Sequence, residues 1–176
     1  MKIYMMALLT LFLIPVTAGA DELSPEQSVQ EIMVKMSGMD PITWPATSEK
    51  YHLVVFIDNQ CSYCADVIKK VQQYTDAGLT MSFLTVAPPT IREQVIGDMA
   101  RVWCSASPRE SLRKAMAGFL PANEASPECI RTVKAQSDLA EHVGIQVSPV
   151  MVVMQAKPVV FVGNASPSEI LKMLQP

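Results

Sequence analysis

Short apolar runs and segments of helical periodicity alternate along the chain. The apolar runs span residues 53–57, 79–86, 150–154 and 158–162, and their length and β-branched content are typical of buried strands. Between the first two runs, residues 64–74 carry apolar side chains at helical spacing, and Gly78 is placed to end that helix. The pattern predicts a β-α-β unit, a helical block over residues 90–143, and a β-β-α unit whose strands form a hairpin.

The dipeptide Ser-Pro marks the starts of helices in this sequence. Four occurrences are followed by an acid or amide and then by helical periodicity, at Ser24, Ser107, Ser126 and Ser166. Serine is a favourable N-cap and proline suits the first helical position, so we expect four helices to begin at these points. The remaining occurrence, Ser148-Pro149, precedes a strand, where a proline cannot donate a hydrogen bond to the sheet.

The first twenty residues have the pattern of a cleavable secretory signal peptide. A basic residue is followed by an apolar run over residues 3–14, and Ala18-Gly19-Ala20 forms a cleavage signal. An uncleaved anchor is the alternative, but the run is shorter than the roughly 20 apolar residues of a membrane helix. We therefore expect a signal peptide at residues 1–20, one helix and a linker at 21–50, and the main domain at 51–176.

Composition and charge narrow the class of protein. Hydrophobic residues make up 49% and charged residues 18% of the 176 residues, which is typical of a folded chain of about one domain. The net charge of −3 argues against a nucleic-acid-binding protein, which would need a basic surface. Five methionines fall on predicted apolar helix faces, so we expect them to pack in the core rather than bind metal: Met33, Met36, Met99, Met116 and Met173.

Two cysteines stand directly after the first strand. Cys61-Ser62-Tyr63-Cys64 begins the predicted helix, where the helix dipole and free N–H groups stabilise a thiolate. A thiolate at this point can attack a disulfide, and the second cysteine can release the substrate from the mixed disulfide. A structural disulfide would close too short a loop to stabilise the fold much. A zinc site would need two further close ligands, and His52 and His142 lie in no ligand pattern. Redox chemistry is the favoured interpretation.

The arrangement resembles the thioredoxin fold, and more closely the catalytic domain of the Dsb family of periplasmic disulfide isomerases. The resemblance covers about residues 51–174 and rests on four stretches in order: residues 54–64 with the C-x-Y-C site, residues 102–105 with Trp103-Cys104, Cys129, and residues 144–149 with Ser148-Pro149. It implies an α/β, thioredoxin-like fold with a helical insertion at about residues 90–143, between the βαβ and ββα halves.

The resemblance also assigns roles to individual residues. It implies that Cys61 is the attacking thiolate and Cys64 the resolving thiol. It implies that Pro149 is a cis-proline that turns the backbone of Ser148 toward the cysteines, where an extended substrate segment can pair with it. This would explain a proline at the start of a strand. Tyr63 either presents an aromatic face to the substrate or is a solvent-exposed spacer.

Three further positions follow from the same resemblance, and Asp58 is singled out by its place before Cys61. Cys104 and Cys129 are expected to form a structural disulfide; two free buried thiols are the alternative, which an oxidising compartment disfavours. Val147 replaces a glycine of the family pattern, which would alter the shape of the substrate groove. Asp58 either assists proton transfer or simply ends the strand. No metal site is expected.

The function implied is that of a periplasmic thiol–disulfide oxidoreductase, of isomerase or reductase type, that acts on exported cysteine-containing proteins. A membrane thiol would donate electrons, and no cofactor is expected. The alternatives are a monomeric dithiol oxidase and a redox-inert binding module of thioredoxin fold. The family's isomerases are dimers with a separate N-terminal domain, whereas Asp21 to Gln60 has room for one helix and a linker. The apolar face of residues 24–35 packs either on its own core or on a partner, so self-association is an open question.

Overall fold

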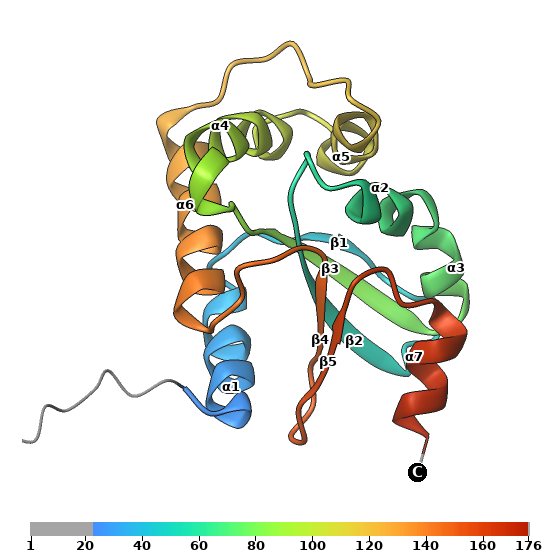
Figure 1. The fold of residues 1–176 in the computed structure, drawn as a ribbon. Coiled ribbons are helices and arrows are strands. Elements are labelled where there is room, and N and C mark those ends of the chain that lie inside the picture. The colour runs from blue at the N-terminus through green and yellow to red at the C-terminus, as the bar shows by residue number, and fades with distance from the viewer. Residues whose placement is uncertain (1–22, 176) are drawn as a thin grey trace, which may run out of the picture.

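Five strands form one mixed sheet in the order β1-β3-β2-β4-β5 (Figure 1). The structure is a computed structural model that describes residues 23–175, so the signal peptide expected at residues 1–20 lies outside it. The strands are β1 (Ile42–Trp44), β2 (Tyr51–Ile57), β3 (Leu79–Thr85), β4 (Val150–Val153) and β5 (Val159–Val162). The sheet and its helices confirm the expected α/β, thioredoxin-like fold. Within the described residues, no helix is both long and apolar enough to cross a membrane.

The centre of the sheet is a parallel pair of buried strands. β2 and β3 run in register from Tyr51 opposite Leu79 to Ile57 opposite Thr85. Their apolar, β-branched runs suit this position because helices cover both faces. β4 pairs antiparallel with β2, and β5 pairs antiparallel with β4, which confirms the predicted hairpin. The carboxyl end of β2 therefore lies beside the start of β4.

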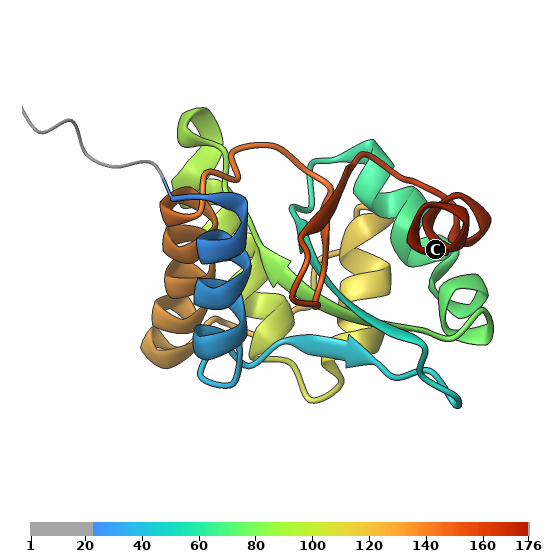
Figure 2. The same cartoon turned by 90° about the horizontal axis from the view of Figure 1, so that it is seen from below.

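Helices cover the sheet in two layers (Figures 1 and 2). α1 (Pro25–Met36) and α6 (Pro127–His142) lie side by side on one face, while α2 (Ser62–Lys69), α3 (Val71–Asp76) and α7 (Pro167–Leu174) lie on the other. The insertion begins with a short 3₁₀ turn (Pro89–Ile91) and α4 (Arg92–Trp103), followed by α5 (Pro108–Met116) and α6. The predicted helical block is confirmed, although residues 64–74 form two short helices rather than one.

The apolar face of α1 packs on the chain's own sheet. Val29 and Ile32 are buried in one cluster with Val54 and Phe56 of β2. Val29 and Ile32 of the predicted apolar face thus pack within the chain, while Met33 of the same face is 48% exposed, and self-association stays an open question.

All four predicted Ser-Pro helix starts are confirmed. Ser24 and Ser166 form complete capping boxes, and the hydroxyl of Ser126 accepts the N–H of Cys129. Ser107 stands at the N-cap of α5 without a side-chain capping bond. The local signal thus located each start, whether or not the cap hydrogen bond forms.

Two expectations from the sequence were wrong in part. The linker expected within residues 21–50 contains β1, which pairs antiparallel with β3 and buries Trp44 against Phe83. Two of the five methionines expected in the core are largely exposed, Met33 at 48% and Met173 at 69%, whereas Met99 is fully buried. Helical spacing alone does not show where an apolar stripe ends, and these two side chains lie beyond that boundary.

Gln136 of α6 satisfies backbone groups at the end of β3 and ahead of β1. The amide oxygen of Gln136 accepts the N–H of Thr85 at 2.9 Å, and its NH₂ donates to the carbonyl of Met39 at 2.7 Å. Because Gln136 is fully buried, these bonds replace contacts with water and fix the helix against the sheet.

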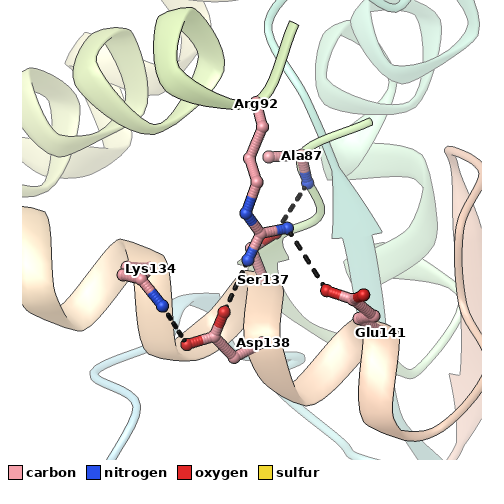
Figure 3. A network of polar contacts seen from close by, with 6 residues as sticks. All are labelled: Ala87, Arg92, Lys134, Ser137, Asp138 and Glu141. Atoms are coloured by element: carbon pink, nitrogen blue, oxygen red, sulfur yellow. Dashed lines mark hydrogen bonds and ion pairs between the residues drawn. The ribbon is translucent and has the colours of Figure 1, made fainter. Parts of the chain in front are cut away.

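A polar network joins the start of α4 to the middle of α6 (Figure 3). The hydroxyl of Ser137 accepts hydrogen bonds from the Ala87 N–H and from the Arg92 guanidinium, each at 3.0 Å. Arg92 also pairs with Asp138 at 2.5 Å and with Glu141 at 3.6 Å. These contacts anchor the insertion where it leaves the sheet.

Candidate active site

Cys61 to Cys64 lie between the end of β2 and the first turn of α2. Cys61 is the N-cap of α2, with extended backbone angles, and its Sγ accepts the N–H of Cys64 at 3.1 Å. A cap residue must leave the helical conformation and accept an N–H of the first turn, and here a sulfur fills that role. The two cysteines are paired as a disulfide with a Cα–Cα distance of 5.2 Å.

The two sulfurs of this pair differ in access. Cys64, in the first turn of α2, is fully buried, whereas Cys61 is half-buried. Tyr63, between them, is 60% exposed. A reagent from solvent therefore reaches Cys61 before Cys64, as disulfide exchange through one attacking sulfur requires.

The loop before β4 lies against the end of β2. The Ser148–Pro149 peptide bond is cis, and β4 begins at the next residue, Val150. The Ser148 hydroxyl donates a hydrogen bond of 2.5 Å to the carboxylate of Asp58. The fold thus brings Ser148 and Pro149 to the end of β2, beside Asp58, across a long separation in sequence.

Asp58 links the two loops of the site. It is 3% exposed; one carboxylate oxygen accepts from Ser148, and the other accepts the Gln60 N–H at 2.8 Å. A carboxylate oxygen of Asp58 and the sulfurs of Cys61 and Cys64 all lie within 4.8 Å of one another. Asp58 therefore both ends the strand with a local turn and faces the sulfurs, so the two sequence interpretations are not exclusive.

A contact that the sequence did not indicate ties the cysteine loop to the insertion. The side-chain NH₂ of Asn59 donates to the Asp98 carboxylate of α4 at 3.0 Å. The amide oxygen of Asn59 is buried and has no hydrogen-bond partner in the part of the chain that the structure describes. The spacing of Asn59 and Asp98 in the sequence carries no motif, so only the fold reveals this pair.

An apolar groove of about 310 Å³ adjoins the Ser148 loop. It runs between α1, the loop before Ser148, and the strands β4 and β5, and none of its lining residues is charged. Three of its lining residues are between 49% and 72% exposed: Val147, Val160 and Val162. β5 is the edge strand of the sheet, so this apolar surface continues to an open edge.

The other two cysteines are also paired. Cys104, at the end of α4, forms a disulfide with Cys129, in the first turn of α6, with a Cα–Cα distance of 5.8 Å. The Ser126 N–H lies 3.3 Å from the sulfur of Cys104. The Cys104–Cys129 disulfide joins α4 to α6, the two longest helices of the insertion.

Potential metal ligands cluster in one place among residues 23–175. Asp58, Cys61 and Cys64 form that group, but both sulfurs are engaged in the disulfide. The sulfurs become available as ligands only in the reduced protein, since the thiolate is the ligand form. His52 and His142 belong to no such group.

Two groups outside the cysteine site have pKa values shifted mainly by burial. Burial lowers the pKa of His52, which bonds to the Ser82 hydroxyl at 2.8 Å. Burial, with smaller effects of Glu169 and Asp66, raises the pKa of Tyr74 to about 12. Both groups therefore favour their neutral forms in the folded protein.

The fold and the paired cysteines define a thioredoxin-fold protein with a Cys-x-x-Cys pair at the start of a helix. Residues 39–176 match the thioredoxin-like domain family, and the chain belongs to that family. The match begins ahead of β1, consistent with β1 being part of the sheet.

Curated relatives bear the name thiol:disulfide interchange protein DsbC. The protein from Haemophilus influenzae is 27% identical over 134 residues, which cover 76% of this chain and 56% of the relative. The protein from Dickeya dadantii is 28% identical over 134 residues, covering 76% and 54%. These matches confirm the resemblance to the Dsb catalytic domain. The chain spans about half the length of the curated relatives it matches.

Solved structures of disulfide proteins share the fold. The catalytic domain of Proteus mirabilis ScsC superposes with a TM-score of 0.60 at 16% identity, covering 83% of this chain and 96% of that one. A disulfide interchange protein from Neisseria gonorrhoeae superposes with a TM-score of 0.60 at 17% identity, covering 76% and 92%. At these identities the likeness establishes the fold alone.

Proposed function

We propose that this chain is a periplasmic thiol–disulfide oxidoreductase of isomerase or reductase type, acting on exported proteins through Cys61 and Cys64. The observation that carries the proposal is the asymmetric pair at the start of α2, with Cys61 accessible and Cys64 buried. The names of the curated relatives support the same chemistry. The leader expected at residues 1–20 supports the compartment.

The exchange reaction follows from the access of the two sulfurs. In the reduced protein the Cys61 thiolate attacks one sulfur of a substrate disulfide, forming a mixed disulfide and releasing the other substrate sulfur as a thiolate. In isomerisation, a substrate thiolate then attacks the mixed disulfide and frees Cys61. In reduction, Cys64 attacks Cys61, which releases a substrate dithiol and restores the Cys61–Cys64 bond. A membrane thiol would return the two electrons.

The surroundings of the pair suit a polypeptide substrate. Ser148, before the cis Pro149, lies beside the site, where its backbone can pair with an extended segment. Tyr63, 60% exposed between the two cysteines, can offer an aromatic face to the substrate. The uncharged groove that begins at Val147 offers apolar contacts to residues flanking the substrate cysteine. Cys104 and Cys129 take a structural role, because they join α4 to α6.

Refolding of scrambled ribonuclease tests the proposal. The reduced wild-type protein is expected to restore ribonuclease activity, and Cys61→Ser is expected to abolish the effect. Cys64→Ser is expected to accumulate a mixed disulfide through Cys61, visible on non-reducing gels. Ser105→Ala, a substitution on a hydroxyl that bonds only to the Val102 carbonyl, serves as a matched control.

The outcomes separate the alternatives. A protein that oxidises reduced ribonuclease but does not rescue the scrambled form is a dithiol oxidase. A protein that does neither, and from which Cys64→Ser traps no substrate, is a redox-inert binding module. Either result would contradict the isomerase or reductase assignment. The mass of the active protein in solution tests self-association separately.

A further inference from the structure

Asp58 is a buried acidic group with an unusual setting. Among the buried residues that the structure describes, the ionisable side chains are those of Asp58, Cys64 and Tyr74, so Asp58 is the only carboxyl group. No ion pair of the described residues involves it. Two hydrogen bonds, from the Gln60 N–H and the Ser148 hydroxyl, support its carboxylate instead. Because burying a charge is costly, the placement of this carboxylate beside the cysteine sulfurs points to a function for its charge.

Two electrostatic effects meet at the cysteine pair. The N-terminus of α2, with Cys61 at its cap, favours the Cys61 thiolate. The carboxylate of Asp58, within 4.8 Å of both sulfurs, opposes it, because like charges repel more strongly away from water. In the disulfide no sulfur carries a charge, so the carboxylate penalises only the reduced, thiolate-bearing state.

We propose that the charge of Asp58 sets the redox balance of the Cys61–Cys64 pair, holding it less oxidising than the helix terminus alone would make it. A pair is strongly oxidising when its reduced form is stabilised, and Asp58 destabilises that form. This inference rests on the proposed function and deepens it. A less oxidising pair favours reduction or isomerisation of substrates over their oxidation, and a thiol donor must keep it reduced. Asp58 acts here as a tuning residue that exchanges no electrons itself.

The balance is measured with glutathione. Two glutathione thiols reduce the Cys61–Cys64 bond, giving two cysteine thiols and one glutathione disulfide, so that electrons and protons balance. Asp58→Asn removes the charge. The carbonyl oxygen of Asn can still accept the Gln60 N–H, and its NH₂ can donate to the Ser148 hydroxyl oxygen in place of accepting from it. We expect its equilibrium constant for reduction to rise about tenfold, which corresponds to about 30 mV toward the oxidising side. In the reduced Asp58→Asn variant, the Cys61 thiolate is expected to form at a lower pH than in the wild type, as followed by its ultraviolet absorbance.

Further variants separate charge from geometry. Ser148→Ala removes the hydroxyl link between the two loops but keeps the charge of Asp58, so it should shift the equilibrium constant by less than Asp58→Asn does. Asp58→Ser also removes the charge and leaves a hydroxyl to accept the Gln60 N–H, which covers the case that Asp58→Asn does not fold. Asp76→Asn removes a negative charge from α3, outside the cysteine cluster, and should change nothing.

Three results would overturn the inference. The first is that both Asp58 variants keep the wild-type equilibrium constant and thiolate titration. The second is that Ser148→Ala reproduces the whole shift, which would assign the effect to loop geometry. The third is an equal shift in Asp76→Asn, which would assign it to net charge. Failure of the proposed function would look different: ribonuclease would not refold although the glutathione equilibrium responded to Asp58.

Discussion

The N–H of Cys64 donates a hydrogen bond of 3.1 Å to the Sγ of Cys61. The donor belongs to the first turn of α2, so in the reduced protein the same N–H can stabilise a thiolate on Cys61. Cys64 has no corresponding advantage, because its own side chain is buried beneath the helix. The two cysteines are thus unequal in charge stabilisation as well as in access.

This inequality predicts selective alkylation. In the reduced protein at neutral pH, iodoacetamide should modify Cys61 at least about tenfold faster than Cys64, because the thiolate is the reacting form and Cys61 is the exposed one. Mass spectrometry of peptides after timed quenching measures both rates. Cys64→Ser should leave the rate at Cys61 within a small factor of the wild type. Comparable rates at the two cysteines in the folded protein would contradict the assignment of the attacking sulfur.

The disulfide between Cys104 and Cys129 predicts a loss of stability on its removal. The bond closes a loop with a sequence separation of 25 residues. Chain entropy for a loop of this size amounts to about 3.5 kcal/mol. The double variant Cys104→Ser, Cys129→Ser should therefore lower the free energy of unfolding in urea by about 3 kcal/mol while keeping glutathione exchange at Cys61. An unchanged urea midpoint would exclude the structural role, and loss of exchange in a folded variant would assign these cysteines to the chemistry.

The sequence predicted most elements of the fold because their signals are local. The caps at Ser24 and Ser166 and the apolar runs of β2 and β3 act within a few residues of chain. β1 escaped prediction because three residues show too short an alternation, and its burial comes from a partner strand distant in sequence. Tertiary pairing, not local preference, makes Ile42–Trp44 a strand.

The candidate site likewise has some parts that the sequence predicts and others that only the fold reveals. The Cys-x-x-Cys spacing and its place after a strand are visible in the sequence, and so is Ser148-Pro149 through the family resemblance. The hydrogen bonds of Asp58 with Ser148 and of Asn59 with Asp98 join residues far apart in the chain. No periodicity encodes such contacts, since they depend on how the loops meet at the end of the sheet.

His52 predicts an acid-sensitive contribution to stability. Burial lowers its pKa in the folded protein from the ordinary 6.5, and nearby Glu49 only partly offsets this. The unfolded chain therefore binds a proton at His52 more readily, so stability is lost as the pH falls through 6.5 toward the lower folded value. Above the unfolded pKa the histidine is neutral in both states and contributes no pH dependence.

Urea unfolding at a series of pH values between neutral and about pH 5 measures this effect. His52→Gln, which can still bond to the Ser82 hydroxyl, should flatten the acid side of the stability profile. His142→Gln, at the exposed end of α6, is the matched control, because it removes a histidine without touching the Ser82 contact. The prediction is wrong if the wild-type and His52→Gln profiles run parallel.

The open edge of β5 predicts that polypeptide substrates, unlike small thiols, depend on the apolar groove. Val162 is 72% exposed on the groove that adjoins Val147 and the Ser148 loop. A lysine there would place a charge among apolar side chains that a bound apolar segment must desolvate. Val162→Lys should slow exchange with an unfolded cysteine-containing polypeptide by about tenfold, or about 1.4 kcal/mol of transition-state binding.

The same variant should react with glutathione at the wild-type rate, because a tripeptide thiol reaches Cys61 without crossing the groove. Met173→Lys introduces an equal charge at a similarly exposed apolar residue, 69% exposed on α7, and should affect neither substrate. Stopped-flow measurement of both reactions for the three proteins gives the comparison. If Val162→Lys slowed glutathione and polypeptide equally, the groove would act on the cysteines and not on the substrate. If it slowed neither, polypeptide substrates would not use this surface.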